Sequence, residues 1–226
     1  MSIDFKAARE AMVRALRSEV SDERVLSAFD RVPRERFVPE EMRRHAYEDR
    51  ALAIGYGQTI SQPLMVAIMT QALSLRGDEK VLEVGTGSGY QTALLSLLAR
   101  EVVSVERVTE LAESAEERLQ RLGYENVRVR VAGEELGWPQ EAPYDAITVA
   151  AGAPTVPPSL LDQLADGGRL LIPVGGRRLQ RLTRATKHRD EVTVEELGEC
   201  RFVPLIAEEE GWPAHDESLN GTKPAF

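Results

Sequence analysis

The chain has 226 residues, 42% hydrophobic and 29% charged, a composition typical of a globular protein with its own buried core. Its 28 Lys and Arg against 37 Asp and Glu give a net charge of −9, which disfavours binding to nucleic acid or to an anionic membrane surface. No apolar run is long enough to span a membrane, the start MSIDFKAARE predicts no signal peptide, and a lone cysteine suits a reducing compartment, so we expect a cytoplasmic protein.

Residues 1–75 are predicted to be a helical segment packed on the core. Apolar residues recur at helical spacing over the first twenty positions, and Ser-Asp-Glu at 21–23 predicts the start of a second helix that ends at Pro33. Six arginines between positions 31 and 50, Arg34 among them, alternate with acidic residues. This pattern favours a solvated surface with ion pairs over an RNA-binding patch.

The stretch YGQTISQPLMVAIM, at 56–69, reads as a loop that leads into a helix. Pro63 suits the first helical turn, and Ser61 or Gln62 can cap it. The free N–H groups of a helix N-terminus are also a suitable place for a carboxylate. From these residues alone, Ser61 is equally well explained as a cap and as part of a binding site.

Residues 76–206 are predicted to form the core of the fold. Strands expected at 80–84, 102–106, 126–131, 144–150 and 169–175 alternate with helices at 90–100, 109–122 and 159–168. Such alternation indicates a parallel sheet with helices on both faces. Two further strands, at 179–186 and 192–206, are expected to close one edge as an antiparallel pair, with Cys200 as a buried strand thiol. The polar residues 207–226 are expected to form a loosely ordered tail.

A glycine-rich turn follows the first of these strands in VLEVGTGSGY. Glycine lets a nucleotide approach the backbone closely, because a side chain there would collide with it. Gly85, Gly87 and Gly89 have the spacing GxGxG, whereas a dinucleotide-binding turn has GxGxxG, and Tyr90 occupies that last position. No Lys-Ser or Lys-Thr pair follows, so the turn is not a P-loop.

Two glutamates at strand ends narrow the choice of cofactor. Glu83 could bind a cationic amino group, which S-adenosylmethionine has and a pyrophosphate lacks. Glu106 lies about twenty positions beyond Gly85, where a carboxylate can accept both hydroxyls of an adenosyl ribose. Each glutamate alone could be a surface charge, but with the glycines they favour S-adenosylmethionine over NAD.

The later runs YDAITV and LLDQLADGGRLLIPVG resemble class I methyltransferases. This resemblance implies an α/β fold, with a Rossmann-like doubly wound sheet, a C-terminal antiparallel edge and an N-terminal helical extension.

A more specific resemblance extends over residues 32–205. The runs VPRERFVPEE, AYEDRALAIGYGQTISQPLMVAIM, VLEVGTGSGYQTALL, GWPQEAPYDAITVAAGAP and RFVPL resemble the protein-L-isoaspartate (D-aspartate) O-methyltransferase family, and the Thr-Ile-Ser element before Pro63 is distinctive of it. The resemblance implies a monomeric enzyme that transfers methyl from S-adenosylmethionine to the α-carboxylate of isoaspartyl or D-aspartyl residues. The substrates would be damaged proteins and peptides, and the reaction would initiate their repair.

The resemblance also implies roles for individual residues. Ser61 would be the active-site residue, with Thr59 and Ile60 lining the same substrate pocket. The cofactor would be bound at Glu83, Gly85, Thr86, Gly87, Gly89, Glu106, Gly133 and Glu134, and S-adenosyl-L-homocysteine would be the product. Gln180 lies near a late glutamine that the family places by the cofactor. No metal is implied.

One position departs from the family. An Asp that bonds the adenine amino group is expected in a Gly-Asp-Gly run, but the corresponding residues here are Ala132-Gly133-Glu134. Glu134 could supply the carboxylate, or the adenine could rely on backbone contacts. This departure leaves open that the chain binds an adenosyl group without catalysing a reaction. A methyltransferase that acts on RNA or on a small molecule is a separate alternative. A nicotinamide oxidoreductase fits the glycine spacing least.

The implied reaction explains the lack of histidine in these motifs. A carboxylate acceptor is already ionised at neutral pH, so the transfer needs no general base. Alignment of the two reactants is then the main requirement, and Ser61 would hold one carboxylate oxygen so that the other faces the methyl group.

Overall fold

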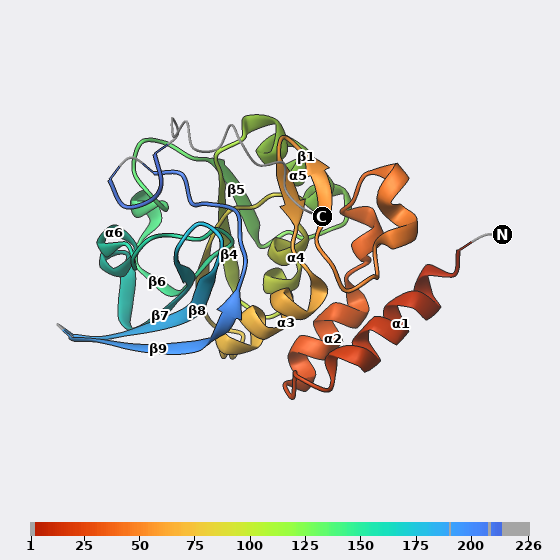
Figure 1. The fold of residues 1–226 in the computed structure, drawn as a ribbon, viewed down its shortest axis with the longest axis horizontal. Helices are drawn as coiled ribbons and strands as arrows, with labels where there is room; N and C mark the ends of the chain where they lie inside the picture. Colours follow the sequence, from red (N-terminus) through yellow and green to blue (C-terminus); the bar gives the residue numbers. More distant parts are fainter. Residues whose placement is uncertain (1–2, 190, 208, 214–226) are drawn as a thin grey trace.

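The computed structural model describes residues 3–189, 191–207 and 209–213, and its centre is a seven-stranded sheet in the order β5-β4-β3-β6-β7-β8-β9 (Figure 1). The strands are β3 (Lys80–Val84), β4 (Glu101–Glu106), β5 (Val127–Val131), β6 (Tyr144–Val149), β7 (Leu164–Gly175), β8 (Gln180–His188) and β9 (Glu191–Cys200). The pairs from β5 to β7 are parallel, and β7, β8 and β9 pair antiparallel. The predicted parallel sheet with an antiparallel edge is confirmed.

Helices cover both faces of this sheet. They are α1 (Phe5–Leu16), α2 (Glu23–Arg31), α3 (Pro63–Ala72), α4 (Tyr90–Ser96), α5 (Thr109–Arg121) and α6 (Pro158–Asp162), with short 3-10 turns at Arg34–Arg36, Glu40–His45 and Pro139–Glu141. Side chains alternate across each strand: Val81 packs in the cluster that contains residues of α1 to α5, and Leu82 packs in the opposite cluster with Leu160 of α6.

The second helix begins and ends where the sequence predicts. The side chain of Asp22 accepts hydrogen bonds from the backbone N–H of Arg24 at 2.8 Å and of Val25 at 3.4 Å, which caps α2. The helix ends at Arg31, and Val32 is extended before Pro33.

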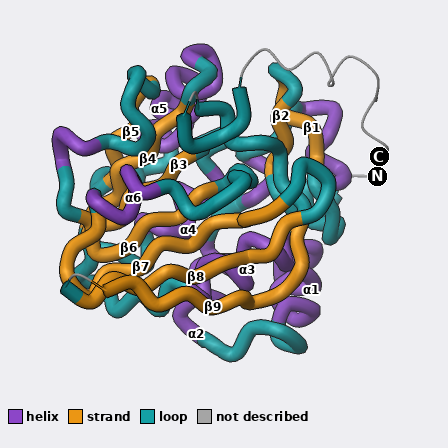
Figure 2. The backbone as a smooth tube through the Cα atoms, turned by 60° about the vertical axis from the view of Figure 1, so that its left-hand side comes forward, coloured by secondary structure: helices purple, strands orange, loops and turns teal. Residues whose placement is uncertain are grey.

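Two elements differ from the expectations. The helix expected at 159–168 has only five residues, because β7 already begins at Leu164 and includes the flexible Asp-Gly-Gly run at 166–168. Residues 56–60, interpreted as part of a loop, belong instead to a hairpin of β1 (Leu52–Gly55) and β2 (Gln58–Ile60). Figures 1 and 2 show this hairpin apart from the large sheet.

The described part of residues 207–213 is held by Trp212. Its indole N–H donates to the carbonyl oxygen of Gly152 at 3.1 Å, and its backbone N–H donates to that of Leu205 at 2.7 Å. The expectation of a loose tail otherwise concerns residues 208 and 214–226, which lie outside the described residues. None of the described helices combines the length and apolar character that crossing a bilayer requires.

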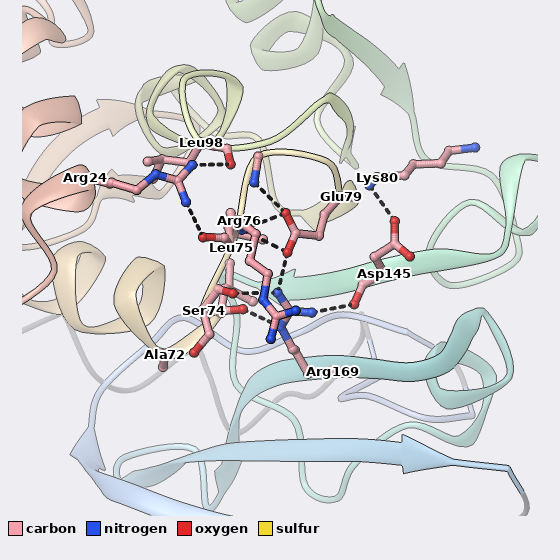
Figure 3. Close-up of polar contacts among 12 residues, drawn as sticks. Arg24, Ala72, Ser74, Leu75, Arg76, Glu79, Lys80, Leu98, Asp145 and Arg169 are labelled. Atoms are coloured by element: carbon pink, nitrogen blue, oxygen red, sulfur yellow. Dashed lines mark hydrogen bonds and ion pairs between the residues drawn. The ribbon is translucent and has the colours of Figure 1, made fainter.

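Arginines from three separate elements hold the C-terminal end of α3 (Figure 3 shows two of them). Arg24 of α2 donates to the carbonyl oxygen of residue 75 at 2.7 Å, and Arg184 of β8 to that of residue 72 at 3.2 Å. Arg169 of β7 donates to those of residues 73 and 74, the second at 2.9 Å. These cations satisfy carbonyl groups that a helix end leaves without partners.

A buried ion pair fixes Arg169 in this position. Its guanidinium lies 3.0 Å from the carboxylate of Glu79, and the two side chains are only 18% and 7% exposed. Glu79 also accepts the backbone N–H groups of Arg76 and Gly77 (Figure 3). The pair therefore connects the end of α3 to the start of β3.

We expect Arg169→Met to lower the free energy of unfolding by about 3 kcal/mol, because it leaves the buried Glu79 carboxylate without its cation. Urea denaturation measures this. Arg181→Met is the matched control: Arg181 lies at the same 3.0 Å from Glu196, but both side chains are more than half exposed, so the loss should stay below about 1 kcal/mol. Equal losses in the two variants would contradict the interpretation.

Candidate active site

The glycine-rich turn between β3 and α4 has the backbone geometry that its sequence predicts. Gly85 has φ +99°, and a Cβ on it would lie 3.3 Å from the Cβ of Ala150. Gly89 has φ +83° and is the residue that precedes α4. Both conformations favour glycine, so the turn can follow the strand closely. The backbone N–H groups of Gly85 and Thr86 donate to the carbonyl oxygen of Val105 at 2.8 and 3.3 Å, which holds the turn against β4.

Glu106, at the end of β4, braces this turn. One carboxylate oxygen accepts the backbone N–H of Gly87 at 2.8 Å, and the other accepts that of Val108 at 2.9 Å. The residue is 7% exposed and contributes to a cavity wall. Each oxygen keeps a further lone pair, so the carboxylate can still accept ligand hydroxyls.

Glu83 lies beneath the turn and not in the cavity wall. It is fully buried, and it accepts hydrogen bonds from the hydroxyls of Thr92 in α4 and Ser104 in β4. The Ser104 hydroxyl lies 2.6 Å from that of Thr86 in the turn. Burial raises the pKa of Glu83 to about 7, although the two hydroxyl hydrogen bonds oppose the rise. The alternation of β3, which puts Glu83 on the same face as Val81, was the sequence signal for this position.

A cavity of about 580 Å³ lies over the carboxyl ends of the parallel strands. Its lining comes from residues 58–61, 66, 84–88, 90–91, 105–108, 132–137, 150–151 and 203–207. Ligands of open parallel sheets bind at this edge. Among the predicted site residues, Thr59, Ile60, Ser61, Gly85, Thr86, Gly87, Glu106, Gly133 and Glu134 line the cavity, and Glu83 and Gly89 do not.

Ser61 is placed by the hairpin β1–β2 on one side and by α3 on the other. Gln62, one of the two expected alternatives, occupies the N-cap position of α3, but its side chain makes no capping hydrogen bond. Asp49 supplies the cap from outside the helix: its carboxylate accepts the backbone N–H of Leu64 at 3.0 Å and the side-chain amide of Gln62 at 2.8 Å. Capping therefore does not require the Ser61 hydroxyl.

A second cavity, of about 390 Å³, shares Thr59, Ser61, Ala150 and Val203 with the wall of the first. It is lined by residues 51, 59, 61–62, 65, 150, 179 and 199–203. Thr59 and Ser61 belong to both walls. The arrangement can hold one ligand on each side of Ser61.

The buried Arg34 is a residue that the sequence analysis placed wrongly. It was expected on a solvated surface, yet it is 0% exposed. Its Nε donates to the carbonyl oxygen of Ala46 at 2.8 Å, and its Nη2 to that of Ser61 at 2.7 Å. Its position between Val32 and Phe37, both buried, was the one local signal of burial. No sequence pattern around Asp49 indicates its role, because that role depends on a contact with Leu64 at the start of α3.

Gln180 and Gly133 complete the predicted set. Gln180 is 2% exposed and lines neither cavity; its amide group bonds the backbone of Gly176 and Phe202. A Cβ on Gly133 would meet no atom within 4 Å, so the cavity has room for a side chain there. Among the described residues, no cluster of His, Cys, Asp and Glu could hold a metal ion.

Comparison with known families gives a consistent result. The sequence model of the protein-L-isoaspartate(D-aspartate) O-methyltransferase family matches residues 7–210. Protein-L-isoaspartate O-methyltransferase 2 of Marinobacter nauticus is 54% identical over 214 residues, which cover 93% of this chain and 97% of the relative. The Myxococcus xanthus protein-L-isoaspartate O-methyltransferase is 56% identical, over 85% of this chain and 92% of its own length.

Solved structures agree with these relatives. A protein-L-isoaspartate O-methyltransferase superposes with a TM-score of 0.77 at 33% identity, covering 86% of this chain and 65% of the other. A beta-aspartate methyltransferase from Plasmodium falciparum, in complex with S-adenosyl-L-homocysteine, has a TM-score of 0.75 at 25% identity, covering 89% of this chain and 98% of the other.

The buried Glu83 predicts a pH dependence of stability. Its pKa is about 7 in the folded chain against an ordinary value of 4.5, so folding favours the protonated form. This contribution is complete below the unfolded pKa and is lost as the pH rises through 7. We expect the ligand-free protein to lose about 3 kcal/mol between pH 4.5 and pH 8 from this group.

Urea denaturation of Glu83→Gln measures this effect, because the amide keeps an oxygen for Thr92 and Ser104 but does not titrate in this range. The variant should lose less stability than the wild type as the pH rises. Glu113→Gln, at an exposed position of α5, should keep the wild-type dependence. Parallel curves for Glu83→Gln and the wild type would contradict the assignment.

Proposed function

On the premise that the chain belongs to the protein-L-isoaspartate(D-aspartate) O-methyltransferase family, we propose that the larger cavity holds S-adenosylmethionine and that Ser61 orients the acceptor carboxylate beside it. The family's reaction is methyl transfer from S-adenosylmethionine to the α-carboxylate of isoaspartyl and D-aspartyl residues in damaged proteins, and this chain is such an enzyme. The observation that carries the residue assignment is the position of Ser61 in the walls of both cavities.

The residues of the larger cavity fit this cofactor. A volume of about 580 Å³ lies within the range of small-molecule sites. Gly85 and Gly87 line the cavity without side chains, so a ligand can approach the turn closely, and the Glu106 carboxylate has free lone pairs for the two ribose hydroxyls. Glu83 is too deep to contact the amino group directly, and we propose that it acts through Thr86 and the turn above it.

Bound S-adenosylmethionine supplies a methyl group on a positively charged sulfur, and the acceptor supplies the electron pair for the new bond. A carboxylate needs no deprotonation at neutral pH. Consistent with this, His45 and His188 line neither cavity, and His215 lies outside the described residues. The protein contributes alignment and the exclusion of water.

Ser61 supplies the alignment. Its hydroxyl is not used for capping, so it can donate a hydrogen bond to one carboxylate oxygen and leave the other directed at the cofactor. We propose that the smaller cavity receives the peptide on the acceptor side, with Thr59 in the walls of both cavities and Ile60 in the wall of the larger one.

We also propose that the enzyme works as a monomer in the cytoplasm without nucleic acid or membrane partners. The net charge of −9 disfavours binding to polyanions such as nucleic acid and to anionic membrane surfaces. The lone Cys200 leaves the fold independent of disulfides.

The test uses methyl-labelled S-adenosylmethionine and two peptides that differ only in an isoaspartyl or a normal aspartyl linkage. We expect base-labile label on the isoaspartyl peptide alone. Ser61→Ala should lower kcat roughly 10- to 100-fold, because one orienting hydrogen bond is lost. Its affinity for S-adenosylhomocysteine, measured by calorimetry, should change less than about threefold.

Ser18→Ala, at an exposed serine after α1, is the control and should match the wild type. A wild-type rate in Ser61→Ala would remove Ser61 from the active site. Label on both peptides would overturn the substrate assignment.

Gly133→Asp should tighten the binding of S-adenosylhomocysteine by about 3- to 10-fold, because the added carboxylate would accept the adenine amino group. The space around Gly133 admits the side chain. Gly133→Ala, which adds a Cβ without a carboxylate, should bind as the wild type does. If Gly133→Asp binds S-adenosylhomocysteine no more tightly than Gly133→Ala does, then Glu134 or the backbone already accepts the hydrogen bond of the adenine amino group. Calorimetry on Glu134→Gln distinguishes these two cases.

A further inference from the structure

Arg34 is a buried cation without an anionic partner. No carboxylate among the described residues forms an ion pair with it, and its Nη1 atom has no hydrogen-bond partner there. Removing a charge from water costs several kcal/mol when no opposite charge offsets it. The Asp49 carboxylate acts on Arg34 electrostatically but forms no ion pair with it, so the positive charge in the interior is only partly offset.

The surroundings of Arg34 are aromatic and dry. Its Cζ lies 4.7 Å from the ring centroid of Tyr90, and the rings of Phe29 and Phe37 pack edge-on against that tyrosine at 6.0 and 5.6 Å. The face of an aromatic ring attracts a cation but does not neutralise it. Electrostatic interactions in such surroundings are stronger than in water, so the charge acts on neighbouring groups with little screening.

The neighbour of Arg34 on the cavity side is the residue assigned to the acceptor. Nη2 donates to the carbonyl oxygen of Ser61, and Tyr90, beneath the guanidinium, also lines the larger cavity. The cation thus lies directly behind the place where a substrate carboxylate would bring a negative charge out of water.

We propose that Arg34 is a positioning residue for the acceptor: its guanidinium fixes the Ser61 peptide and its charge offsets that of the isoaspartyl carboxylate. This inference rests on the proposed function of Ser61 and extends it. Arg34 touches neither substrate nor cofactor in this scheme; it acts through Ser61 and through its field. The charge of Arg34 would oppose, at the position of Ser61, the carboxylates of Glu106, Glu134 and Glu135 that also line the larger cavity.

The test compares two ligands on enzyme saturated with S-adenosylhomocysteine, which has no methyl group to transfer. One is an isoaspartyl peptide, and the other is the same peptide with the α-carboxylate replaced by the neutral carboxamide. Calorimetry gives the affinity ratio of carboxylate to amide. A purely structural role would change both affinities together, whereas a charge effect changes the ratio.

Arg34→Lys and Arg34→Gln form the decisive pair, because both side chains keep an N–H donor and only the lysine keeps the charge. We expect Arg34→Gln to lower the ratio at least ~10-fold, and Arg34→Lys to keep it within about threefold of the wild type. Arg34→Gln should likewise raise KM for the isoaspartyl peptide more than it lowers kcat. An unchanged ratio in Arg34→Gln would overturn the proposal.

Arg24→Met is the matched control at the other end of α3. Arg24 also donates to backbone carbonyls, of Leu75 at 2.7 Å and Leu98 at 3.5 Å, so its loss loosens the helix without altering the charge near Ser61. The affinity ratio of carboxylate to amide in Arg24→Met should equal that of the wild type. A drop in the Arg24→Met ratio equal to that of Arg34→Gln would assign the effect to the helix and not to the charge.

Binding of S-adenosylhomocysteine reports whether each variant is folded. If Arg34→Gln does not bind S-adenosylhomocysteine, the Arg34→Lys variant provides the test. A wild-type affinity ratio of carboxylate to amide in Arg34→Lys supports the proposal. A lowered ratio in an Arg34→Lys variant that still binds S-adenosylhomocysteine overturns it. A wild-type enzyme that does not methylate the isoaspartyl peptide would instead contradict the proposed function, which separates the two failures.

Discussion

Helix α3 is fixed at both of its ends by side chains from other elements, and the site depends on this constraint. Asp49 and Arg34 hold the N-terminal end, where Ser61 lies, and Arg24, Arg169 and Arg184 hold the C-terminal end. The Glu79–Arg169 pair links α3 to the start of β3. The helix that follows Ser61 is therefore connected to the strand that leads into the glycine-rich turn at 85–89. A transfer limited by alignment benefits from such rigidity.

A polar layer under α4 connects the sheet to the cofactor turn. Glu83, Ser104 and Thr148 lie side by side on β3, β4 and β6, on the face that the helix covers. They bond Thr92, Thr86 and Gln91, so this part of the core is held by directional contacts as well as by apolar packing. The glycine-rich turn at 85–89 is therefore held to the sheet below it by these hydrogen bonds.

The sequence predicted elements whose signals are local. The cap at Asp22, the glycine spacing at 85–89 and the alternating strands all follow from neighbouring residues, and the structure contains them. Arg34 and Asp49 act through contacts with residues far away in the chain. Only the position of Arg34 between the apolar residues Val32 and Phe37 distinguishes it locally from the exposed arginines beside it. The short α6 was misjudged because apolar residues at 160–164 fit a helix, although Asp-Gly-Gly after them favours an early return to strand.

Cys200 ends β9 in the wall of the smaller cavity, and its burial raises the pKa of the thiol to about 11. At neutral pH about one molecule in ten thousand would then carry a thiolate, the form that reacts with oxidants and electrophiles. The thiol stays chemically quiet although it borders the site. A protonated thiol at this position would leave the wall of the smaller cavity chemically unmodified.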